Sequence, residues 1–224
     1  MDGNWRELAG SNDVGSSSRS RAQRAAKRAY DITAALAGLV LLSPAMVIVA
    51  LFVKLQDGGP VLFAHRRIGK HGAAFMCYKF RSMVLDADKR LVALLASDPD
   101  AAEEWARDQK LRNDPRVTPL GRFLRKSSLD ELPQLFNILK GDMSVVGPRP
   151  IVADEIVRYG AHFEAYKSVT PGITGPWQVS GRNDVTYDER VEMDAEYAAN
   201  WTVAGDIWIT WKTVPSVLFS RGAS

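Results

Sequence analysis

The apolar positions of this chain are most concentrated in one run near its N-terminus, ITAALAGLVLLSPAMVIVALFVKL, which spans residues 32–55. No charged residue lies between Asp31 and Lys54. An α-helix needs about 20 predominantly apolar residues to cross the hydrocarbon core of a membrane. A cleaved signal peptide has a shorter apolar region that begins earlier, and no small-residue cleavage site follows this run. The pattern therefore predicts a membrane helix.

Ser43 and Pro44 interrupt the middle of this run. Proline has no backbone N–H and clashes with the preceding turn, so we expect a kink or break there, with the Ser43 hydroxyl bonding a freed carbonyl. Basic residues lie on both sides of the run, and such residues favour the cytoplasmic face. A bent helix that re-enters the same face satisfies both flanks and is preferred. A spanning helix with a tolerated kink stays open as the alternative.

Beyond Gly58 the pattern changes to short, separate elements. Two strands are predicted near residues 61–67 and 74–80, joined by a turn at 69–72. Apolar positions at helical spacing predict amphipathic helices in most of the remaining chain. These helices are expected over 85–111, with an interruption at 97–100, and over 121–126, 129–141, 151–166 and 187–201, whereas the glycine- and proline-rich segment 170–184 is expected to be a loop.

Several tryptophans lie in the C-terminal half of the chain. The apolar segment 206–220 has too few apolar residues to cross a membrane. Tryptophan is favoured at membrane interfaces, and it also fills protein cores. The sequence therefore leaves open which environment holds the four rings, which belong to Trp177, Trp201, Trp208 and Trp211.

Together these elements predict an α+β fold that is mostly helical. Residues 1–20 are polar and serine-rich, and we expect them to form a disordered tail. Residues 21–57 hold the basic flank and the re-entrant membrane helix. Residues 58–224 are expected to form one small cytosolic domain with a short β-hairpin and amphipathic helices at the membrane interface.

The composition narrows the function without selecting one. Hydrophobic residues make up 46% of the chain, which indicates a globular protein rather than a disordered one. The net charge of +3 and a pI of about 9.0 allow an anionic partner without requiring one. Cys77 is the single cysteine, so an internal disulfide is excluded. The three histidines have no metal-ligand spacing: His65, His71 and His162.

The segment SSLDELPQLFNILKGD places two adjacent carboxylates, Asp130 and Glu131, at an expected helix start. Ser128 and Glu131 have the spacing of a capping box, in which both residues are structural. Pro133 falls in the first helical turn if Asp130 is the cap instead, and the sequence does not settle the register. The alternative is chemistry, because a carboxylate can attack a phosphoryl group and form an acyl phosphate.

Chemistry of this kind requires cations, because two carboxylates repel an anionic substrate. Arg122, Arg125 and Arg149 lie close to the dyad in the sequence, and Mg²⁺ would be a stronger counter-charge. Pro148 and Pro150 stiffen the backbone on both sides of Arg149. The predicted hairpin and its exit add a second basic group, which is either a solvated face beside anionic lipid or a set of phosphate contacts: Arg67, Lys70, Lys79 and Arg81.

Four long motifs in fixed order resemble the bacterial sugar transferases. This family consists of monotopic phosphoglycosyl transferases that pass a sugar 1-phosphate from a nucleotide sugar to a polyprenyl phosphate. The resemblance covers roughly residues 28–215 and is to the short, exopolysaccharide-initiating members. The motifs are the YD-apolar-SP-apolar segment over 30–55, GPVLFAHRRIGKHGAAFMCYKFRSM, RVTPLGRFLRKSSLDELPQLFNILKGDMSVVGPRP and TPGITGPWQVSGRN.

The resemblance implies a helix bent at Ser43 and Pro44 in the bacterial inner membrane, with the catalytic domain on the cytoplasmic face. It implies that Asp130 attacks the β-phosphate of a UDP-sugar, releases UMP and carries the phosphosugar until undecaprenyl phosphate accepts it. Glu131 would orient Asp130 or assist the second attack, and Asp130 would hold Mg²⁺ together with substrate phosphate. The implied phosphate or substrate contacts are Lys79, Arg81, Arg125 and Arg149, with Arg182 and Asn183 on the nucleotide side.

Two other functions fit less well. A membrane-anchored basic module that binds lipid or nucleic acid without catalysis explains the anchor and the charge. It does not explain carboxylates among the arginines, which weaken anion binding, and no nucleic-acid partner is expected. A glycosidase needs its carboxylates on both sides of the scissile bond, about 5–9.5 Å apart, and neighbouring residues are poorly placed for that.

The partners that follow are membrane lipid, polyprenyl phosphate and a nucleotide sugar. UDP-galactose or UDP-glucose is the expected donor, because the short members of the family often begin exopolysaccharide assembly with these sugars. The sequence leaves the sugar itself, the polyprenyl length, a homodimer and the later pathway open.

Overall fold

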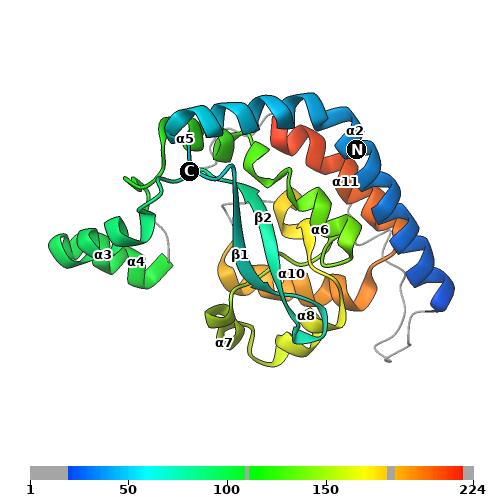
Figure 1. The fold of residues 1–224 in the computed structure, drawn as a ribbon. Helices are drawn as coiled ribbons and strands as arrows, with labels where there is room; N and C mark the ends of the chain where they lie inside the picture. The colour runs from blue at the N-terminus through cyan, green and yellow to red at the C-terminus, as the bar shows by residue number, and fades with distance from the viewer. Residues whose placement is uncertain (1–19, 109–110, 181–184, 219–224) are drawn as a thin grey trace.

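The computed structural model describes residues 20–108, 111–180 and 185–218, and they form a mostly helical α+β fold (Figure 1). The predicted tail over residues 1–20 lies outside this part of the chain except for Ser20. One long helix, α2 (Arg21–Asp57), runs along one side of the fold. The β1–β2 hairpin and most of the shorter helices lie on one side of α2.

Helix α2 continues through Pro44 rather than breaking there, and Figure 1 shows that it bends between its two halves. The proline nitrogen has no hydrogen to donate to the carbonyl four residues earlier, which belongs to Val40. The Ser43 hydroxyl donates to that Val40 oxygen at 3.0 Å, as the sequence predicted. The predicted bend is therefore present, and the Val40 carbonyl, which has no N–H donor at Pro44, is bonded by the Ser43 hydroxyl instead. Re-entry into the membrane stays a prediction.

The apolar half of α2 is largely exposed. Among the described residues, α2 is the only helix long and apolar enough to cross a membrane, and 11% of its most apolar window is buried. The core helix of a soluble protein would be mostly covered, whereas a large exposed apolar patch indicates a membrane or a partner. The exposed large side chains on this helix are Leu36, Val40, Leu41, Leu42, Val47, Ile48, Leu51, Phe52 and Leu55.

The predicted hairpin is confirmed. Strand β1 (Leu62–Ile68) pairs antiparallel with β2 (Ala74–Phe80), and the short 3₁₀ turn η1 (Lys70–Gly72) joins them. Residues directly opposite each other in such a pair share a face, and side chains alternate along each strand. Because His65 pairs with Cys77 and Phe63 pairs with Lys79, one face of the hairpin carries these side chains together with Arg67.

The expected loop over 170–184 is wrong in part. It contains β4 (Gly172–Thr174), which pairs in parallel with β3 (Ser144–Val146), and the short helix α9 (Pro176–Ser180). Each strand is only three residues long, which is too short for an alternating pattern to reveal it. Glycine is needed at this contact, because a Cβ on Gly172 would lie 2.1 Å from the backbone nitrogen of Gly147.

The expected helix over 151–166 is also wrong. The segment breaks at Gly160, whose φ of 48° and ψ of −127° lie outside the helical region, and which only glycine adopts readily. The chain there forms η3 (Ala153–Glu155), α7 (Ile156–Tyr159), η4 (Gly160–His162) and α8 (Phe163–Ser168). The other helices are confirmed within a few residues at their ends: α3 (Ala87–Ser97), α4 (Pro99–Asp108), α5 (Pro119–Lys126), α6 (Gln134–Lys140) and α10 (Tyr187–Asn200), followed by α11 (Val203–Leu218).

The four tryptophans divide between the two environments that the sequence left open. Trp177 and Trp201 are buried, and Trp208 is packed partly against the core. Trp211 on α11 is 75% exposed and is the one of the four rings free to reach an interface.

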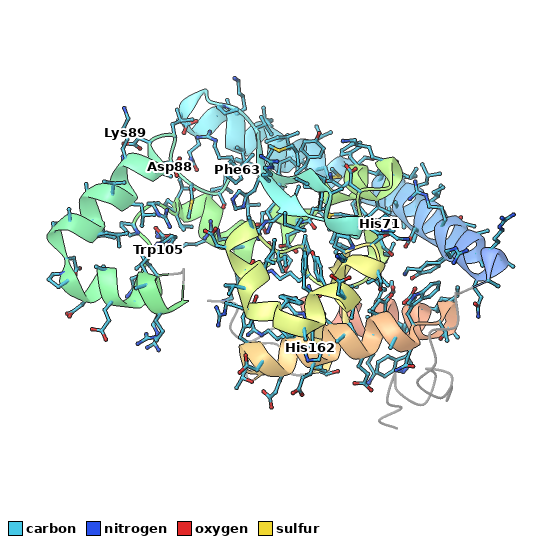
Figure 2. All side chains as sticks on the ribbon, turned by 90° about the horizontal axis from the view of Figure 1, so that it is seen from below. Phe63, His71, Asp88, Lys89, Trp105 and His162 are labelled. Carbon is cyan, nitrogen blue, oxygen red and sulfur yellow. The ribbon has the colours of Figure 1, made fainter. Side chains whose placement is uncertain are left out.

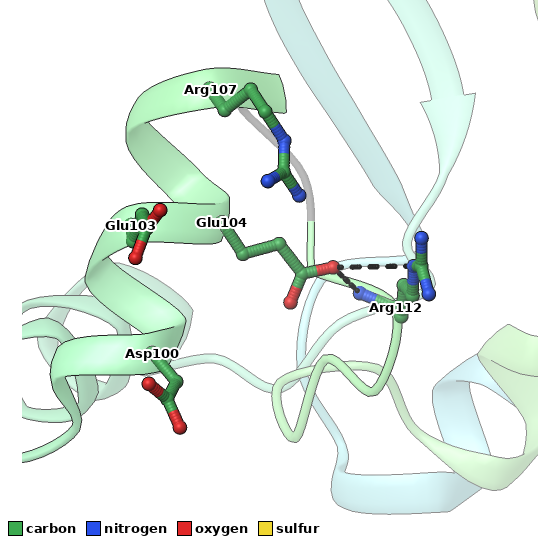
Figure 3. A pocket seen from close by; sticks show the side chains of 5 residues that line it. All are labelled: Asp100, Glu103, Glu104, Arg107 and Arg112. Carbon is green, nitrogen blue, oxygen red and sulfur yellow. Dashed lines mark hydrogen bonds and ion pairs between the residues drawn. The ribbon is translucent and has the colours of Figure 1, made fainter.

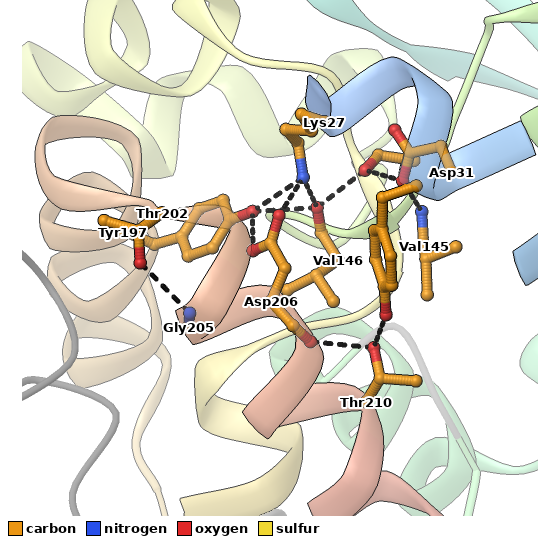
Figure 4. A network of polar contacts seen from close by, with 11 residues as sticks. Lys27, Asp31, Val145, Val146, Tyr197, Thr202, Gly205, Asp206 and Thr210 are labelled. Carbon is orange, nitrogen blue, oxygen red and sulfur yellow. Dashed lines mark hydrogen bonds and ion pairs between the residues drawn. The ribbon is translucent and has the colours of Figure 1, made fainter. Parts of the chain in front are cut away.

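A buried polar network joins the N-terminal half of α2 to the domain (Figure 4). The Lys27 ammonium donates to Asp206 Oδ2 at 2.5 Å and to the Tyr197 hydroxyl at 3.1 Å. It also donates to the carbonyl oxygen of Val146, in strand β3, at 3.0 Å. One turn further along α2, Asp31 accepts a hydrogen bond from the Val145 N–H at 2.9 Å. Helix α2 is thereby fixed to β3 and α11 through charged side chains that are out of water.

A second contact joins α2 to α6. The Arg28 guanidinium donates to the carbonyl oxygens of Ile138 and Leu139 at 2.6 and 2.7 Å. These carbonyls lie in the last turn of α6, where a helix has no internal donors for them and where positive charge is favourable. Gly141 ends the helix in the left-handed conformation, with φ 92°. Helix α6 is therefore capped by a side chain of α2.

Replacing Lys27 with methionine should strongly destabilise the folded domain. Asp206 is 0% exposed, so the substitution leaves a buried carboxylate without its cation, a change that typically costs about 3–5 kcal/mol. Thermal unfolding of the full chain in detergent would measure this loss. Arg24→Met is the matched control, since Arg24 is exposed on the same helix. The double variant Lys27→Met/Asp206→Leu should recover most of the stability, and equal losses in Lys27→Met and Arg24→Met would contradict the network's role.

Candidate active site

The two adjacent carboxylates lie in a short turn between two helices. Residues Leu129–Glu131 form the single 3₁₀ turn η2, and α6 begins four residues after Asp130 with Pro133 as its N-cap. Ser128 makes no side-chain cap bond, so the predicted capping box is wrong, and neither Ser128 nor Asp130 caps α6. Both carboxylates are therefore free of the structural role that the spacing suggested.

Ser128 has an uncommon backbone conformation directly before the dyad. Its φ of 56° and ψ of 15° lie in the left-handed region, which costs a residue other than glycine roughly 1–2 kcal/mol. Such strain persists only where the surrounding structure imposes it, and it is typical of functional sites. Here it turns the chain out of α5 and directs the next residues toward the hairpin.

Glu131 is paired with a cation from the hairpin. Lys79 in β2 donates to Glu131 Oε1 at 2.6 Å. Burial by itself raises the pKa of Glu131, but the charge and hydrogen bond of Lys79 outweigh it and hold the pKa below its ordinary value. Glu131 is therefore ionised at neutral pH and neutralised by its partner.

The position of Lys79 is set by an asparagine that the sequence analysis missed. Asn137, fully buried in α6, accepts from the Tyr78 N–H at 3.0 Å and donates to the Met76 carbonyl at 2.7 Å. These two bonds fix β2 to α6 at the residue next to Lys79. A polar residue on the apolar face of the helix LPQLFNILK was the available signal.

Asp130 has the opposite environment. Its side chain is 6% exposed, and no other described residue donates a hydrogen bond to its carboxylate. Burial raises its pKa from 3.8 to about 6, the charge of Glu131 adds to that rise, and Lys79 and Arg125 oppose it. A buried carboxylate whose oxygens are not bonded to another described residue can attack an electrophile or bind a cation.

Arg125 supplies positive charge from α5. Its Nε donates to the Ser82 hydroxyl at 2.9 Å, and its pKa is lowered mainly by burial. Helix α5 lies directly on the backbone at Ser82, because a Cβ on Gly121 would be 1.9 Å from the Ser82 oxygen. The close approach that glycine allows brings Arg125 within electrostatic range of Asp130.

Arg149 lies on the other side of the dyad. It follows β3, is partly buried, and its charge lowers the pKa of Glu131. Arg67 in β1 lies beside it and donates to the Pro150 carbonyl at 3.2 Å. The pKa of Arg67 is lowered by burial and then by the charge of Arg149. The sequence analysis noted Arg67 only as part of a basic face, because the contact between β1 and the Pro148–Pro150 segment is not visible in the sequence.

The structure brings together Asp130, Glu131, Lys79, Arg125 and Arg149, but it gives Arg81 other partners. Arg81 donates to both carboxylate oxygens of Asp57, at 2.6 Å through Nη1, and to the Pro60 carbonyl at 2.8 Å. These bonds fix the C-terminal end of α2, so a phosphate contact by Arg81 stays a prediction without support from its hydrogen bonds. The predicted nucleotide-side residues Arg182 and Asn183 lie outside the described residues.

The dyad fits a hard cation with few protein ligands. Magnesium is commonly bound by one or two carboxylates, with substrate phosphates and water completing its coordination. Asp130 has unshared oxygens for this purpose. Within the described part of the chain, no three acidic, histidine or cysteine side chains gather into an all-protein metal site. Figure 2 shows His71 and His162 on separate elements.

A shallow pocket on α4 does not join the dyad. It is lined by acidic and basic side chains, and Glu104 accepts from the Arg112 N–H at 2.9 Å (Figure 3). The hairpin of α3 and α4 projects from the body of the fold (Figure 1). The lining residues are Asp100, Glu103, Glu104, Arg107 and Arg112.

Asp194 is a second buried carboxylate that the sequence analysis did not identify. It lies in α10, is 1% exposed, and accepts from the Tyr159 hydroxyl at 2.7 Å through Oδ2. Its Oδ1 is buried without a hydrogen-bond partner. Burial raises the pKa of Asp194 from 3.8 to about 7, against the hydrogen bond from Tyr159 and the charges of Arg149 and Arg190.

Comparison with known proteins identifies the family of this chain. Residues 22–220 match the bacterial sugar transferase family, and the chain belongs to that family. It is 54% identical over 204 residues to the undecaprenyl-phosphate galactose phosphotransferase of Salmonella typhimurium, covering 91% of this chain and 42% of that protein. It is 50% identical over 198 residues to the exopolysaccharide production protein ExoY of Rhizobium meliloti, covering 88% of each.

A third relative carries a different sugar in its name. The undecaprenyl-phosphate glucose phosphotransferase of Komagataeibacter xylinus is 42% identical over 210 residues, covering 88% of this chain and 36% of that protein. The chain therefore spans less than half the length of the two named phosphotransferases and most of the length of ExoY.

Asp194→Asn should reduce the pH dependence of stability. Because the folded pKa of Asp194 is raised above its ordinary 3.8, its contribution favours the fold at low pH and is lost as pH rises toward about 7. Asparagine keeps an acceptor for Tyr159 and cannot ionise. Unfolding of the full chain in denaturant at about pH 5 and about pH 8 should show the variant gaining roughly 1 kcal/mol or more on the wild type at the higher pH. An unchanged pH slope would rule out this carboxyl group as its source.

Proposed function

We propose that this protein transfers a sugar 1-phosphate from a nucleotide sugar to undecaprenyl phosphate and forms a covalent phosphosugar on Asp130. The observation that carries the proposal is the Asp130 carboxylate itself. It is buried, has no hydrogen-bond donor from another described residue, and lies within electrostatic range of Lys79 and Arg125. Such a group is a competent nucleophile toward phosphorus when cations hold an anionic substrate beside it.

In the first step an Asp130 oxygen attacks the β-phosphorus of the donor. A bond forms between this oxygen and phosphorus while the bond from phosphorus to the bridging oxygen breaks. The bridging oxygen keeps the electron pair and leaves with the nucleoside monophosphate, which is UMP for a UDP-sugar. The sugar phosphate remains on Asp130 as an acyl phosphate.

In the second step a phosphate oxygen of the polyprenyl acceptor attacks the same phosphorus. The acyl phosphate bond breaks, its electron pair returns to the Asp130 carboxylate, and the polyprenyl diphosphate sugar is released. Neither step needs a proton from the protein, because the attacking and leaving atoms are oxyanions. A covalent intermediate lets two anionic substrates use one site in turn, so their mutual repulsion is avoided.

The surrounding charges suit this sequence of events. Lys79 neutralises Glu131, so Glu131 can orient the substrate phosphates without repelling them as an isolated charge would. Arg125 and Arg149 act on the dyad from different elements and stabilise the charge on the transferring phosphoryl group. Mg²⁺ held by Asp130 and substrate phosphate would add further positive charge to the phosphate oxygens.

The exposed apolar half of α2 supports a reaction at a membrane surface. In our proposal α2 re-enters the cytoplasmic face of the bacterial inner membrane, and the domain lies on that face. The acceptor phosphate is tethered to a lipid at the headgroup level, so anchoring the dyad at that depth supplies proximity and orientation. The non-catalytic binding module is not favoured, because it gives Asp130 no role.

The donor follows from the relatives. Two of them carry galactose and glucose in their names, and a third is an exopolysaccharide production protein. We therefore propose UDP-galactose or UDP-glucose as the donor and the first membrane step of exopolysaccharide assembly as the role.

Asp130→Asn should abolish formation of the lipid product and of any phosphosugar adduct. The substitution keeps the size of the side chain but removes the nucleophile, so a loss of at least about a thousandfold in rate is expected. The assay is UMP release and lipid product formation by the full chain in lipid nanodiscs with Mg²⁺. Asp154→Asn, an exposed carboxylate outside the site, is the control. Full product formation by Asp130→Asn, or an adduct mapped to another residue, would refute the assignment.

A further inference from the structure

Three arginines from three different elements gather beyond the dyad. Arg149 follows β3, Arg158 lies in α7 and Arg190 lies in α10. The pKa of Arg190 is lowered by burial first and then by the charges of Arg149 and Arg158, so Arg190 lies within electrostatic range of both. We call Arg149, Arg158 and Arg190 the arginine group.

Two of these side chains are held by aromatic rings. The Arg158 guanidinium lies 3.6 Å from the Tyr187 ring centroid, and the Arg190 guanidinium lies 4.6 Å from the Trp177 ring centroid. A guanidinium stacked on a ring is fixed by its plane, while its N–H donors point outward in that plane. This arrangement fixes two positive charges at low entropic cost, and the Arg190 Nε also donates to the Val185 carbonyl at 3.2 Å.

Two members of the group, Arg149 and Arg158, have no acidic partner among the described residues. Asp194 is buried, and one of its oxygens is bonded to Tyr159. Glu155 accepts from the Val152 N–H at 2.9 Å and lies 3.7 Å from Arg67. No ion pair among the described residues includes Arg149 or Arg158. Like charges held close together repel, so this cluster is favourable when an anion binds it.

The arginine group lies on the side of the domain away from the apolar half of α2. In Figure 1, α7, α8 and α10 occupy the end of the fold opposite α2 and α5, and the β1–β2 hairpin runs between the two ends. Arg149 connects this end to the dyad, because its charge acts on both Glu131 and Asp194. A water-soluble ligand reaches this side more readily than a lipid headgroup does.

We propose that Arg158 and Arg190, together with Arg149, bind the nucleoside monophosphate half of the donor while its β-phosphate faces Asp130. The identity of the ligand rests on the proposed function. The same group would hold the departing nucleoside monophosphate after the first step. Arg158 and Arg190 are thus binding residues for the donor, and the acceptor lipid phosphate reaches Asp130 from the α5 side.

The test measures UMP binding to the full chain in nanodiscs by calorimetry, with inorganic phosphate as a second probe. Loss of one charged hydrogen bond to phosphate should raise the Kd of Arg158→Gln and Arg190→Gln for UMP about tenfold or more. The KM for the UDP-sugar should rise in parallel, and the KM for polyprenyl phosphate should stay unchanged. Arg66→Gln is the matched control, because Arg66 is exposed on the opposite face of the hairpin.

The outcomes separate the inference from the proposed function. Unchanged UMP affinity in both variants overturns the inference, and so does a rise confined to the KM for polyprenyl phosphate. If the wild type binds UMP through these arginines but makes no lipid product, the proposed function fails and the nucleotide site stands. If either glutamine variant shows no thermal unfolding transition, Arg158→Lys and Arg190→Lys replace them in the test. Lysine keeps the positive charge but lacks the planar guanidinium that stacks on the ring. The lysine variants are then expected to weaken UMP binding by a smaller factor, and wild-type affinity in both would overturn the inference.

Discussion

The structure depends on the fixed attachment of the long apolar helix α2 to the elements that carry the dyad. Lys27 and Asp31 bind β3, whose C-terminal end leads to Arg149, and Arg28 caps α6, whose N-terminal end follows Asp130. A charged side chain buried with its partners is costly to detach, because separation leaves an unpaired charge out of water. The position of the dyad relative to α2 is therefore fixed, and in the proposed function the depth of α2 in the membrane sets the depth of the dyad.

The second constraint is electrostatic and separates two neighbouring carboxylates. Glu131 is paired with Lys79 and stays ionised, whereas Asp130 is buried without a donor from another described residue, and its pKa rises to about 6. Pairs of acids whose environments push their pKa values apart commonly divide their roles in catalysis. The two carboxylates follow the left-handed turn at Ser128; Glu131 is bonded to Lys79 of the hairpin, and the charges of Lys79 and Arg125 both act on Asp130.

Local sequence predicts most of the helices and the hairpin. It does not predict the contacts between residues that are far apart in the chain. The membrane helix with its Ser43–Pro44 compensation, the hairpin and most helices follow from periodicity and turn chemistry within short windows. The β3–β4 pair, the break at Gly160 and the route of Glu131 to Lys79 depend on backbone contacts between residues far apart in the chain. The capping box of Ser128 and Glu131 does not form, and Glu131 is bonded to Lys79 of β2 instead. Asn137 and Lys27 were missed because a buried polar residue reveals its purpose only through its partners.

The arrangement of cations around Asp130 bears on the order of substrate binding. Arg125 approaches from α5, next to the apolar half of α2, and Arg149 approaches from the side that continues into the arginine group. In the proposed reaction the donor occupies the side of the arginine group, and the lipid phosphate occupies the side of α5. The Asp130 carboxylate lies between them. Because only one phosphoryl group is bonded to Asp130 at a time, the positive charge between the two sides serves both substrates in succession. A site built for simultaneous binding would have to neutralise both anions together, and a single unpaired carboxylate in its centre would then oppose that task rather than perform it.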